Sequence, residues 1–189
     1  QPSFDPILNR LNEEPSLVTQ LLGELVDALL KESNPDVLIL TVPFPGCLLG
    51  ALQIAKTAKA TTPRIRVVLG GGYVNTELRT LRDARIFQII DAMTFDDGER
   101  PLECLLEYWG QKRPREKLFR TMMLSEKVSG QIEYINSRDE HDIPQADTGF
   151  PTVEGLKVRD YISMVEMLNP MHRFWSDLYW NKLMLAHGC

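Results

Sequence analysis

Hydrophobic residues recur with a helical period near the start of the chain. Between Ser16 and Pro35, apolar side chains fall at i, i+3, i+4 and i+7, which predicts an amphipathic helix capped by the Ser16 hydroxyl. Pro35 ends this helix because the residue before a proline avoids helical backbone angles. The pattern then changes to an unbroken apolar run over residues 37–42, which is typical of a strand buried on both faces of a parallel sheet.

The alternation of helical and strand patterns continues along the chain. Helices are predicted over residues 47–59 and 101–109, and short apolar runs over 65–69 and 92–95 predict two further strands. Strands that alternate with helices over short connections form a parallel sheet with helices on both faces. The predicted fold class is therefore α/β, with a Rossmann-like (flavodoxin-like) sheet, followed by a β-hairpin over residues 118–136.

Three unusual loops follow the three predicted strands, at residues 41–46, 70–73 and 96–99. Ligands of such sheets bind at the carboxyl ends of the strands, so these loops form the expected binding edge. The glycines at 70–72 allow the backbone to approach a bulky ligand, but a tight turn without any ligand explains them equally well. The acidic residues of the third loop also suit the start of a helix, near the positive end of its dipole.

Composition and charge narrow the possible classes of function. The chain has 189 residues, 43% of them apolar and 25% charged, which is typical of a globular protein of one or two domains. A formal net charge of −5 argues against a nucleic-acid partner, and the absence of any apolar run near the ~20 residues of a membrane span argues against a membrane protein. Three widely spaced cysteines do not form a disulfide framework, so a reducing, cytoplasmic location is expected.

A basic run at residues 111–115 marks the expected domain edge. We place a first α/β domain at residues 1–110 and a hairpin-and-linker segment at residues 111–189. The basic run could bind phosphate, but a solvated linker is the commoner role of such a run. Because the chain begins with Gln1 and stops at Cys189, it is expected to be a piece of a longer protein.

Two parts of the chain resemble a known cofactor motif. Thr41-Val42-Pro43, followed after 26 residues by Gly70-Gly71, resembles the second half of the cobalamin-binding signature, which is written DxHxxG, then SxL, then GG. The segments 67–77 and 96–101 extend the likeness, which is to the N-terminal domain of cobalamin (B12)-binding radical SAM proteins. The terminal segment 183–189 resembles the approach to the radical SAM barrel, whose clustered cysteines hold a [4Fe–4S] cluster.

The resemblance implies a cobalamin site at the binding edge. The residues that it assigns to this site are Thr41, Val42, Pro43, Gly70, Gly71, Gly72, Tyr73, Asp97, Gly98 and Glu99. It also implies that Cys189 is the first cluster ligand, that the parent protein uses S-adenosylmethionine, and that this chain's partner is the parent's radical SAM domain. The implied activity of the parent is methyl or alkyl transfer to an unreactive carbon, and this chain alone is expected to be inactive.

Two departures from the family pattern leave alternatives open. Thr-x-Pro replaces Ser-x-Leu, and the DxHxxG string would fall before Gln1, so either a truncation removed it or the parent binds cobalamin without a lower histidine. Only three strands are predicted before the hairpin, so either earlier strands are missing or the free edge pairs with a second copy in a homodimer. The alternative function is a non-catalytic interaction or dimerisation module that has lost cobalamin. A nucleotide-binding oxidoreductase has less support, because no GxGxxG motif is present.

Overall fold

The computed structural model describes residues 3–149, 152 and 154–155. The chain divides into two compact units, Gln1–Asp142 and Ile143–Cys189. The described part of the second unit contains one short 3-10 helix, η5 (Gln145–Asp147). The helices, strands and candidate site considered below all belong to the first unit.

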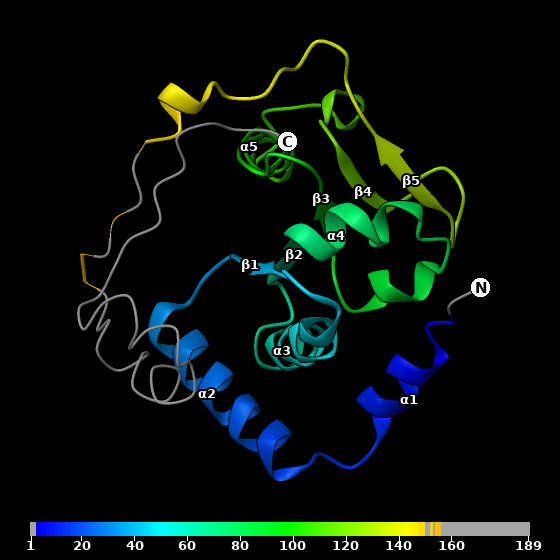
Figure 1. Cartoon of the computed structure of the whole chain (residues 1–189), viewed down its shortest axis with the longest axis vertical. Helices are drawn as coiled ribbons and strands as arrows, with labels where there is room; N and C mark the ends of the chain where they lie inside the picture. The colour runs from blue at the N-terminus through cyan, green and yellow to red at the C-terminus, as the bar shows by residue number, and fades with distance from the viewer. Residues whose placement is uncertain (1–2, 150–151, 153, 156–189) are drawn as a thin grey trace, which may run out of the picture. The chain divides into compact units, whose positions relative to one another are not determined.

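Five strands form one mixed sheet in the order β1-β2-β3-β4-β5 (Figure 1). The first three pair in parallel, as predicted, and the last two form an antiparallel hairpin whose first strand pairs with β3. The strands are β1 (Val37–Thr41), β2 (Arg66–Gly70), β3 (Ala92–Thr94), β4 (Thr121–Leu124) and β5 (Ile132–Ile135).

Helices flank this sheet, and α3 and α5 lie on opposite sides of it (Figure 1). Short helical turns also make up most of the crossover from β2 to β3. Within the described residues, no helix has both the length and the apolar character needed to cross a membrane. The α-helices are α1 (Asp5–Asn12), α2 (Leu17–Ser33), α3 (Leu48–Thr61), α4 (Gly72–Thr76) and α5 (Glu99–Trp109), and the 3-10 helices are η1 (Pro45–Cys47), η2 (Leu78–Thr80), η3 (Ala84–Gln88) and η4 (Arg115–Lys117).

The ends of α2 follow the rules used to predict them. The Ser16 hydroxyl accepts a hydrogen bond from the backbone N–H of Thr19 at 3.3 Å, which satisfies one of the free amides of the first turn. At the other end Asn34 adopts a left-handed conformation with φ 43°, and its N–H donates to the carbonyl of Leu30. Pro35 follows directly, so the predicted stop is confirmed.

The strand at residues 37–42 is not buried on both faces, so that prediction is wrong for β1. Among the described strands β1 pairs with β2 alone, and it therefore forms an edge of the sheet. The Ile39 side chain is 50% exposed. The centre of β2, which has a neighbouring strand on each side, is buried instead, and its Val67, Val68 and Leu69 are all at 0% exposure.

The first compact unit does not end near residue 110. Gly110 does follow the last residue of α5, but the chain then returns to the sheet, where Met122 of β4 pairs with Met93 of β3. The hairpin therefore belongs to the same unit, which extends to Asp142. A composition change marked the end of a helix here and not the end of the domain.

The two arginines of the basic run beside this point are not freely solvated, although Lys112 is exposed. The Arg113 guanidinium is only 11% exposed and forms ion pairs with Glu107 and Glu140. Arg115, at 14% exposure, pairs with Glu133 at 3.0 Å. Because these cations are already neutralised by carboxylates, they tie the chain after α5 to its surroundings and offer no free charge for phosphate.

Candidate functional site

The first two predicted loops lie side by side at the carboxyl edge of the sheet. Thr41, the last residue of β1, pairs with Gly70, the last residue of β2. Beyond this pair the Val42 N–H donates to the Gly70 carbonyl at 2.7 Å, and the Tyr73 N–H donates to the Val42 carbonyl at 3.0 Å. The structure thus brings together the residues that the sequence placed at one edge, and we call Thr41–Pro43 with Gly70–Tyr73 the glycine rim.

Gly71 has a conformation that only glycine adopts readily, with φ 101° and ψ 178°. A Cβ atom there would lie 2.9 Å from both Cγ2 of Thr41 and the backbone nitrogen of Val42. The close approach that this glycine permits is therefore an approach to strand β1. The tight-turn explanation accounts for Gly71 without any ligand.

The neighbouring glycines are less constrained. A Cβ at Gly70 would lie 3.3 Å from Oγ1 of Thr94, and one at Gly72 would lie 3.3 Å from the carbonyl oxygen of Pro43. Gly72 is exposed, so the backbone outside the turn is accessible to a bound molecule. Of the three glycines, Gly72 is the exposed one, although its Cβ position is close to the Pro43 carbonyl.

The residues of β1 and the loop after it contribute to the rim in different ways. Thr41 and Pro43 are exposed at its surface, and the Thr41 hydroxyl is a group that can bind a polar part of a ligand. Val42 has a fully buried side chain, and its backbone N–H and carbonyl are both used in the hydrogen bonds described above. Val42 therefore supports the rim from below.

The third loop is held in place through Asp96. This residue has φ 61°, and its N–H donates a hydrogen bond to Oδ1 of Asn75 at 2.8 Å. Its carboxylate forms ion pairs with Arg79 and Arg120. Because Asn75 belongs to α4, which begins at the rim, these contacts fix the third loop relative to the triple glycine.

The other acidic residues of the third loop lead into α5. This helix begins at Glu99, an acidic residue in its first turn, as the helix-start interpretation predicted. Asp97 and Gly98 are half-buried between Asp96 and the helix, whereas Glu99 is exposed. The three predicted site residues of this loop are therefore adjacent to one another at the start of α5.

Sequence reasoning missed the residues that hold this loop. Arg79 lies over the Phe95 ring, 5.1 Å from its centre, and Arg120 forms a two-pronged ion pair with Asp142 at 2.8 and 2.9 Å. Phe95 in turn meets Tyr134 edge-to-face at 5.7 Å, and partial burial raises the pKa of that tyrosine. Nothing in the spacing of these residues along the chain indicated that they would meet.

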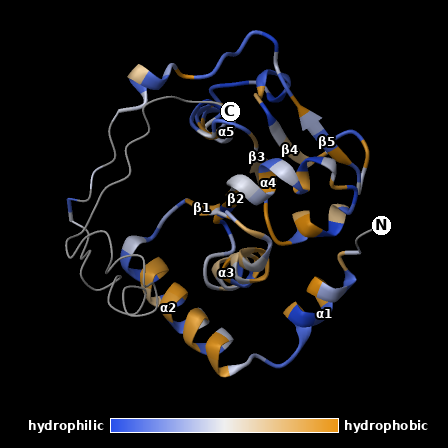
Figure 2. Ribbon diagram, viewed as in Figure 1, coloured by the Kyte–Doolittle hydropathy of each residue, from blue (hydrophilic) through white to orange (hydrophobic). Residues whose placement is uncertain are grey.

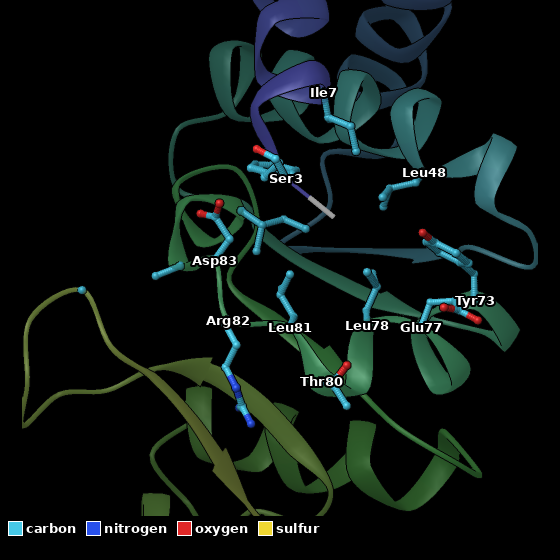
Figure 3. A pocket seen from close by; sticks show the side chains of 14 residues that line it. Ser3, Ile7, Leu48, Tyr73, Glu77, Leu78, Thr80, Leu81, Arg82 and Asp83 are labelled. Atoms are coloured by element: carbon cyan, nitrogen blue, oxygen red, sulfur yellow. The ribbon is translucent and has the colours of Figure 1, made fainter. Parts of the chain in front are cut away.

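A cavity of about 740 Å³ opens beside the rim (Figure 3). Tyr73 lines one wall of it together with Glu77, and Ile7 and Leu48 supply part of its apolar lining. Among the labelled side chains, Asp83 brings a second carboxylate to the cavity (Figure 3). Ser3, Thr80 and Arg82 also line it, so the cavity is about as polar as it is apolar and is more polar than a typical small-molecule site.

The described residues contain no cluster of three or more His, Cys, Asp or Glu side chains that could hold a metal ion. Cys47 is exposed and Cys104 is buried, and burial raises the pKa of the Cys104 thiol. The predicted cluster ligand, Cys189, lies outside the described residues. The groups that the rim itself offers to a ligand are a hydroxyl, bare backbone and a phenol, which bind and orient.

The residues at the rim leave room for the tail of a cobalamin over the turn, but not between the two strands. The exposed Thr41 hydroxyl and the bare backbone at Gly72 suit a bulky polar tail lying over the turn. The space between Thr41 and Gly71 is already filled by the protein's own atoms, so no tail enters there.

In comparisons with known proteins, no family model matches the chain, and no curated protein matches it.

Proposed function

We propose that this chain is the cobalamin-binding portion of a radical SAM iron–sulfur enzyme. The observation that carries the proposal is the glycine rim, in which a Thr-x-Pro string and a triple glycine from neighbouring parallel strands meet at the carboxyl edge of the sheet. Ligands of open α/β sheets bind at this edge. The likeness of these two strings to the SxL and GG elements of the cobalamin signature supports a corrinoid as the class of ligand.

The proposal assigns separate roles to the residues of the rim. Thr41 and Pro43 bind the tail from the β1 side, and Gly72 gives it close access to the backbone. Tyr73 borders the cofactor next to the cavity, and the loop of Asp97, Gly98 and Glu99 forms a second border. Cobalamin, when bound, supplies alkyl-transfer chemistry that side chains lack.

The remaining cofactors belong to the parent enzyme. We propose that Cys189 is the first thiolate ligand of a [4Fe–4S] cluster, and that the parent's radical SAM domain binds this cluster together with S-adenosylmethionine. The product of the parent's reaction is an alkylated, previously unreactive carbon. These 189 residues by themselves bind cofactor and do not catalyse the reaction.

One observation favours a second candidate function, that of an interaction module without cobalamin. Gly71, the most constrained residue of the rim, is explained by its contact with Thr41 and Val42 alone. A rim of this shape is thus compatible with a fold that has no ligand. The two functions differ in whether a corrinoid binds at Gly72.

Binding of hydroxocobalamin distinguishes the two functions. The longest form of the protein that carries these 189 residues is dialysed to equilibrium against hydroxocobalamin, and the visible spectrum of the retained corrinoid is recorded. We expect stoichiometric retention with a shifted spectrum. Gly72→Leu places a large side chain over the turn and is expected to weaken binding at least about 10-fold, a loss of about 1.4 kcal/mol.

Gly50→Leu is the matched control, because Gly50 is a residue of α3 that does not belong to the glycine rim, and a Cβ there meets no atom within 4 Å. This variant is expected to bind hydroxocobalamin as the unchanged protein does. Retention of no corrinoid by the folded protein would replace the cofactor-binding proposal with the interaction module. Equal binding by both glycine variants would remove the rim as the site.

A further inference from the structure

Helix α2 carries a row of large apolar side chains that nothing in the described structure covers. Figure 2 shows this helix as predominantly hydrophobic along its length. The row repeats at intervals of about one turn, and its five members are each 54–75% exposed. They are Leu17, Val18, Leu21, Leu25 and Leu29, which we call the α2 face.

The α2 face is separate from the surface that α2 uses to pack against α3. On the packed side Val26 and Leu30 are buried, and Asp27 accepts a hydrogen bond from Thr61 of α3 at 3.0 Å. At 3.6 residues per turn, the five exposed members span an arc of about 120° that borders this packed side. Because a helix with a single partner needs an apolar stripe of only about 100°, the sequence of α2 provides for two partners.

The polar residues of α2 support the same conclusion. Gln20, Glu24, Asp27 and Lys31 fall within about 60° of one another on the helical wheel. Lys31 and Asp27 pair with each other across one turn. The charged residues of α2 other than Glu32 thus lie on one narrow side, where Asp27 also contacts α3, and Glu32 is the one charged residue within the arc of the α2 face.

The area of the α2 face matches one half of a standard protein interface. Five side chains at these exposures leave on the order of 500 Å² of apolar surface accessible, near the upper end of the roughly 300–600 Å² of the largest patch on a typical monomer. A standard interface buries about 800 Å² on each partner. About 65% of a homodimer interface is apolar, which corresponds to roughly 500 Å² on each side.

We propose that the α2 face binds the α2 face of a second copy of this chain, with the two helices antiparallel about a two-fold axis. An apolar row is self-complementary, as an interface between identical surfaces requires. The antiparallel arrangement brings Leu17 and Leu21 of one copy against Leu29 and Leu25 of the other.

This interaction does not depend on whether the glycine rim binds cobalamin. The rim lies at the carboxyl ends of β1 and β2, whereas the α2 face precedes β1 in the chain and belongs to a helix that packs on α3.

The alternative surface for a contact with another chain is the free edge of β1, which an extended segment could extend by one strand. Its binding would depend on Ile39, in the middle of that strand.

The oligomeric state of the 189-residue protein tests the proposal. Light scattering coupled to size-exclusion chromatography is expected to give a mass of twice 21.6 kDa over the micromolar range. The double variant Leu21→Lys with Leu25→Lys is expected to be monomeric, with dimerisation weakened about 100-fold or more. Both positions are exposed in the single chain, so circular dichroism is expected to show an unchanged fold.

Two controls separate the α2 face from other surfaces. Leu106→Lys changes an exposed leucine on α5 and is expected to leave the dimer intact, and Ile39→Lys on the free edge of β1 is expected to do the same. Dissociation caused by Ile39→Lys alone would assign the contact to the strand edge. A monomeric unchanged protein would overturn the proposal outright.

A charge-swap experiment tests the antiparallel pairing itself. The variant with Leu21→Glu and Leu25→Glu is expected to be monomeric, because like charges would meet across the two-fold axis. Mixed in equal amounts with the double lysine variant, it is expected to form a heterodimer, since the lysines of one variant then face the glutamates of the other. A mixture that associates no more tightly than either variant alone would refute the antiparallel register, in which lysines face glutamates.

Discussion

Replacing Gly71 with alanine tests whether the glycine rim is required by the fold itself. The substitution adds one methyl group at a residue with φ 101° and ψ 178°, a combination that is adopted almost only by glycine. The added carbon would lie 2.9 Å from Cγ2 of Thr41 and from the nitrogen of Val42, and 3.0 Å from the Val42 carbonyl oxygen. Two of these three atoms belong to backbone that is fixed by hydrogen bonds to β2 and to the turn.

The cost of Gly71→Ala has two parts. The backbone conformation costs about 1–3 kcal/mol for a residue with a Cβ. The overlap with atoms that cannot move away costs about 1–3 kcal/mol more, as for other overpacked sites. We therefore expect the free energy of unfolding to fall by about 2–6 kcal/mol, with no ligand present.

Urea unfolding followed by circular dichroism measures this loss. Gly46→Ala is the matched control, because Gly46 lies in η1 near the same edge of the sheet and a Cβ there meets no atom within 4 Å. That variant is expected to change stability by less than about 1 kcal/mol. A loss below about 1 kcal/mol for Gly71→Ala would show that the turn tolerates a side chain, and would refute the explanation from contact with β1.

Three further outcomes are expected. Burial raises the pKa of Glu140, but hydrogen bonds from Arg113 and Arg100 lower it by more, so the pKa in the folded protein lies below the usual 4.5. The stability that the ionised Glu140 contributes is therefore present above about pH 4.5 and is lost as the pH falls through the pKa of the folded state. Glu140→Gln should therefore cost about 3 kcal/mol at pH 7 and flatten the acid limb of a stability–pH curve measured by urea unfolding. With the third cysteine replaced by serine, a thiol reagent should label Cys47 at once and Cys104 only on unfolding, as measured by mass spectrometry. Gly50→Ala, within α3, should raise the urea midpoint by the equivalent of about 0.5–1 kcal/mol.

Among the first 110 residues, the strands and the helices α2, α3 and α5 were predictable because their signals are local, whereas α1 and the short turns between β2 and β3 were not predicted. The Ser16 cap, the Asn34-Pro35 stop and the two strands β2 and β3 depend on neighbouring residues alone. The exposure of β1 was not predictable in the same way. An edge strand and a central strand of a parallel sheet can have the same apolar sequence, and only the number of neighbouring strands distinguishes them.

The place of the hairpin depends on contacts that are distant in sequence. Its own strands were predicted, but its pairing with β3 joins Met93 to Met122 across 29 residues. The prediction of a solvated linker at the basic run after α5 missed the ion pairs of its arginines for the same reason. Arg113 is neutralised by Glu140, which lies 27 residues further along, and no local pattern indicates that pair.

The candidate site was predictable in its strands and not in its supports. Strand ends of a parallel sheet meet at one edge whatever their sequence, so Thr41 and Gly70 had to be neighbours once β1 and β2 were paired. The contacts of Asn75 and Arg79 with Asp96 join residues 17 or more positions apart and use side chains common on any surface. Such contacts follow from the packing of α4 and η2, which the sequence pattern left undefined.

The adjacent glycines Gly71 and Gly72 have different surroundings, so a substitution at Gly71 tests the fold of the turn and one at Gly72 tests ligand binding. Gly71 is enclosed by β1, so any side chain there disturbs the fold and reports nothing specific about a ligand. Gly72 is exposed, but a Cβ there would lie 3.3 Å from the Pro43 carbonyl oxygen, so a side chain requires a small shift of that backbone, and its effect on corrinoid binding has to be compared with its effect on stability. A rim that loses stability through Gly71 and corrinoid binding through Gly72 would have both functions. A rim that loses stability alone would be explained by its fold.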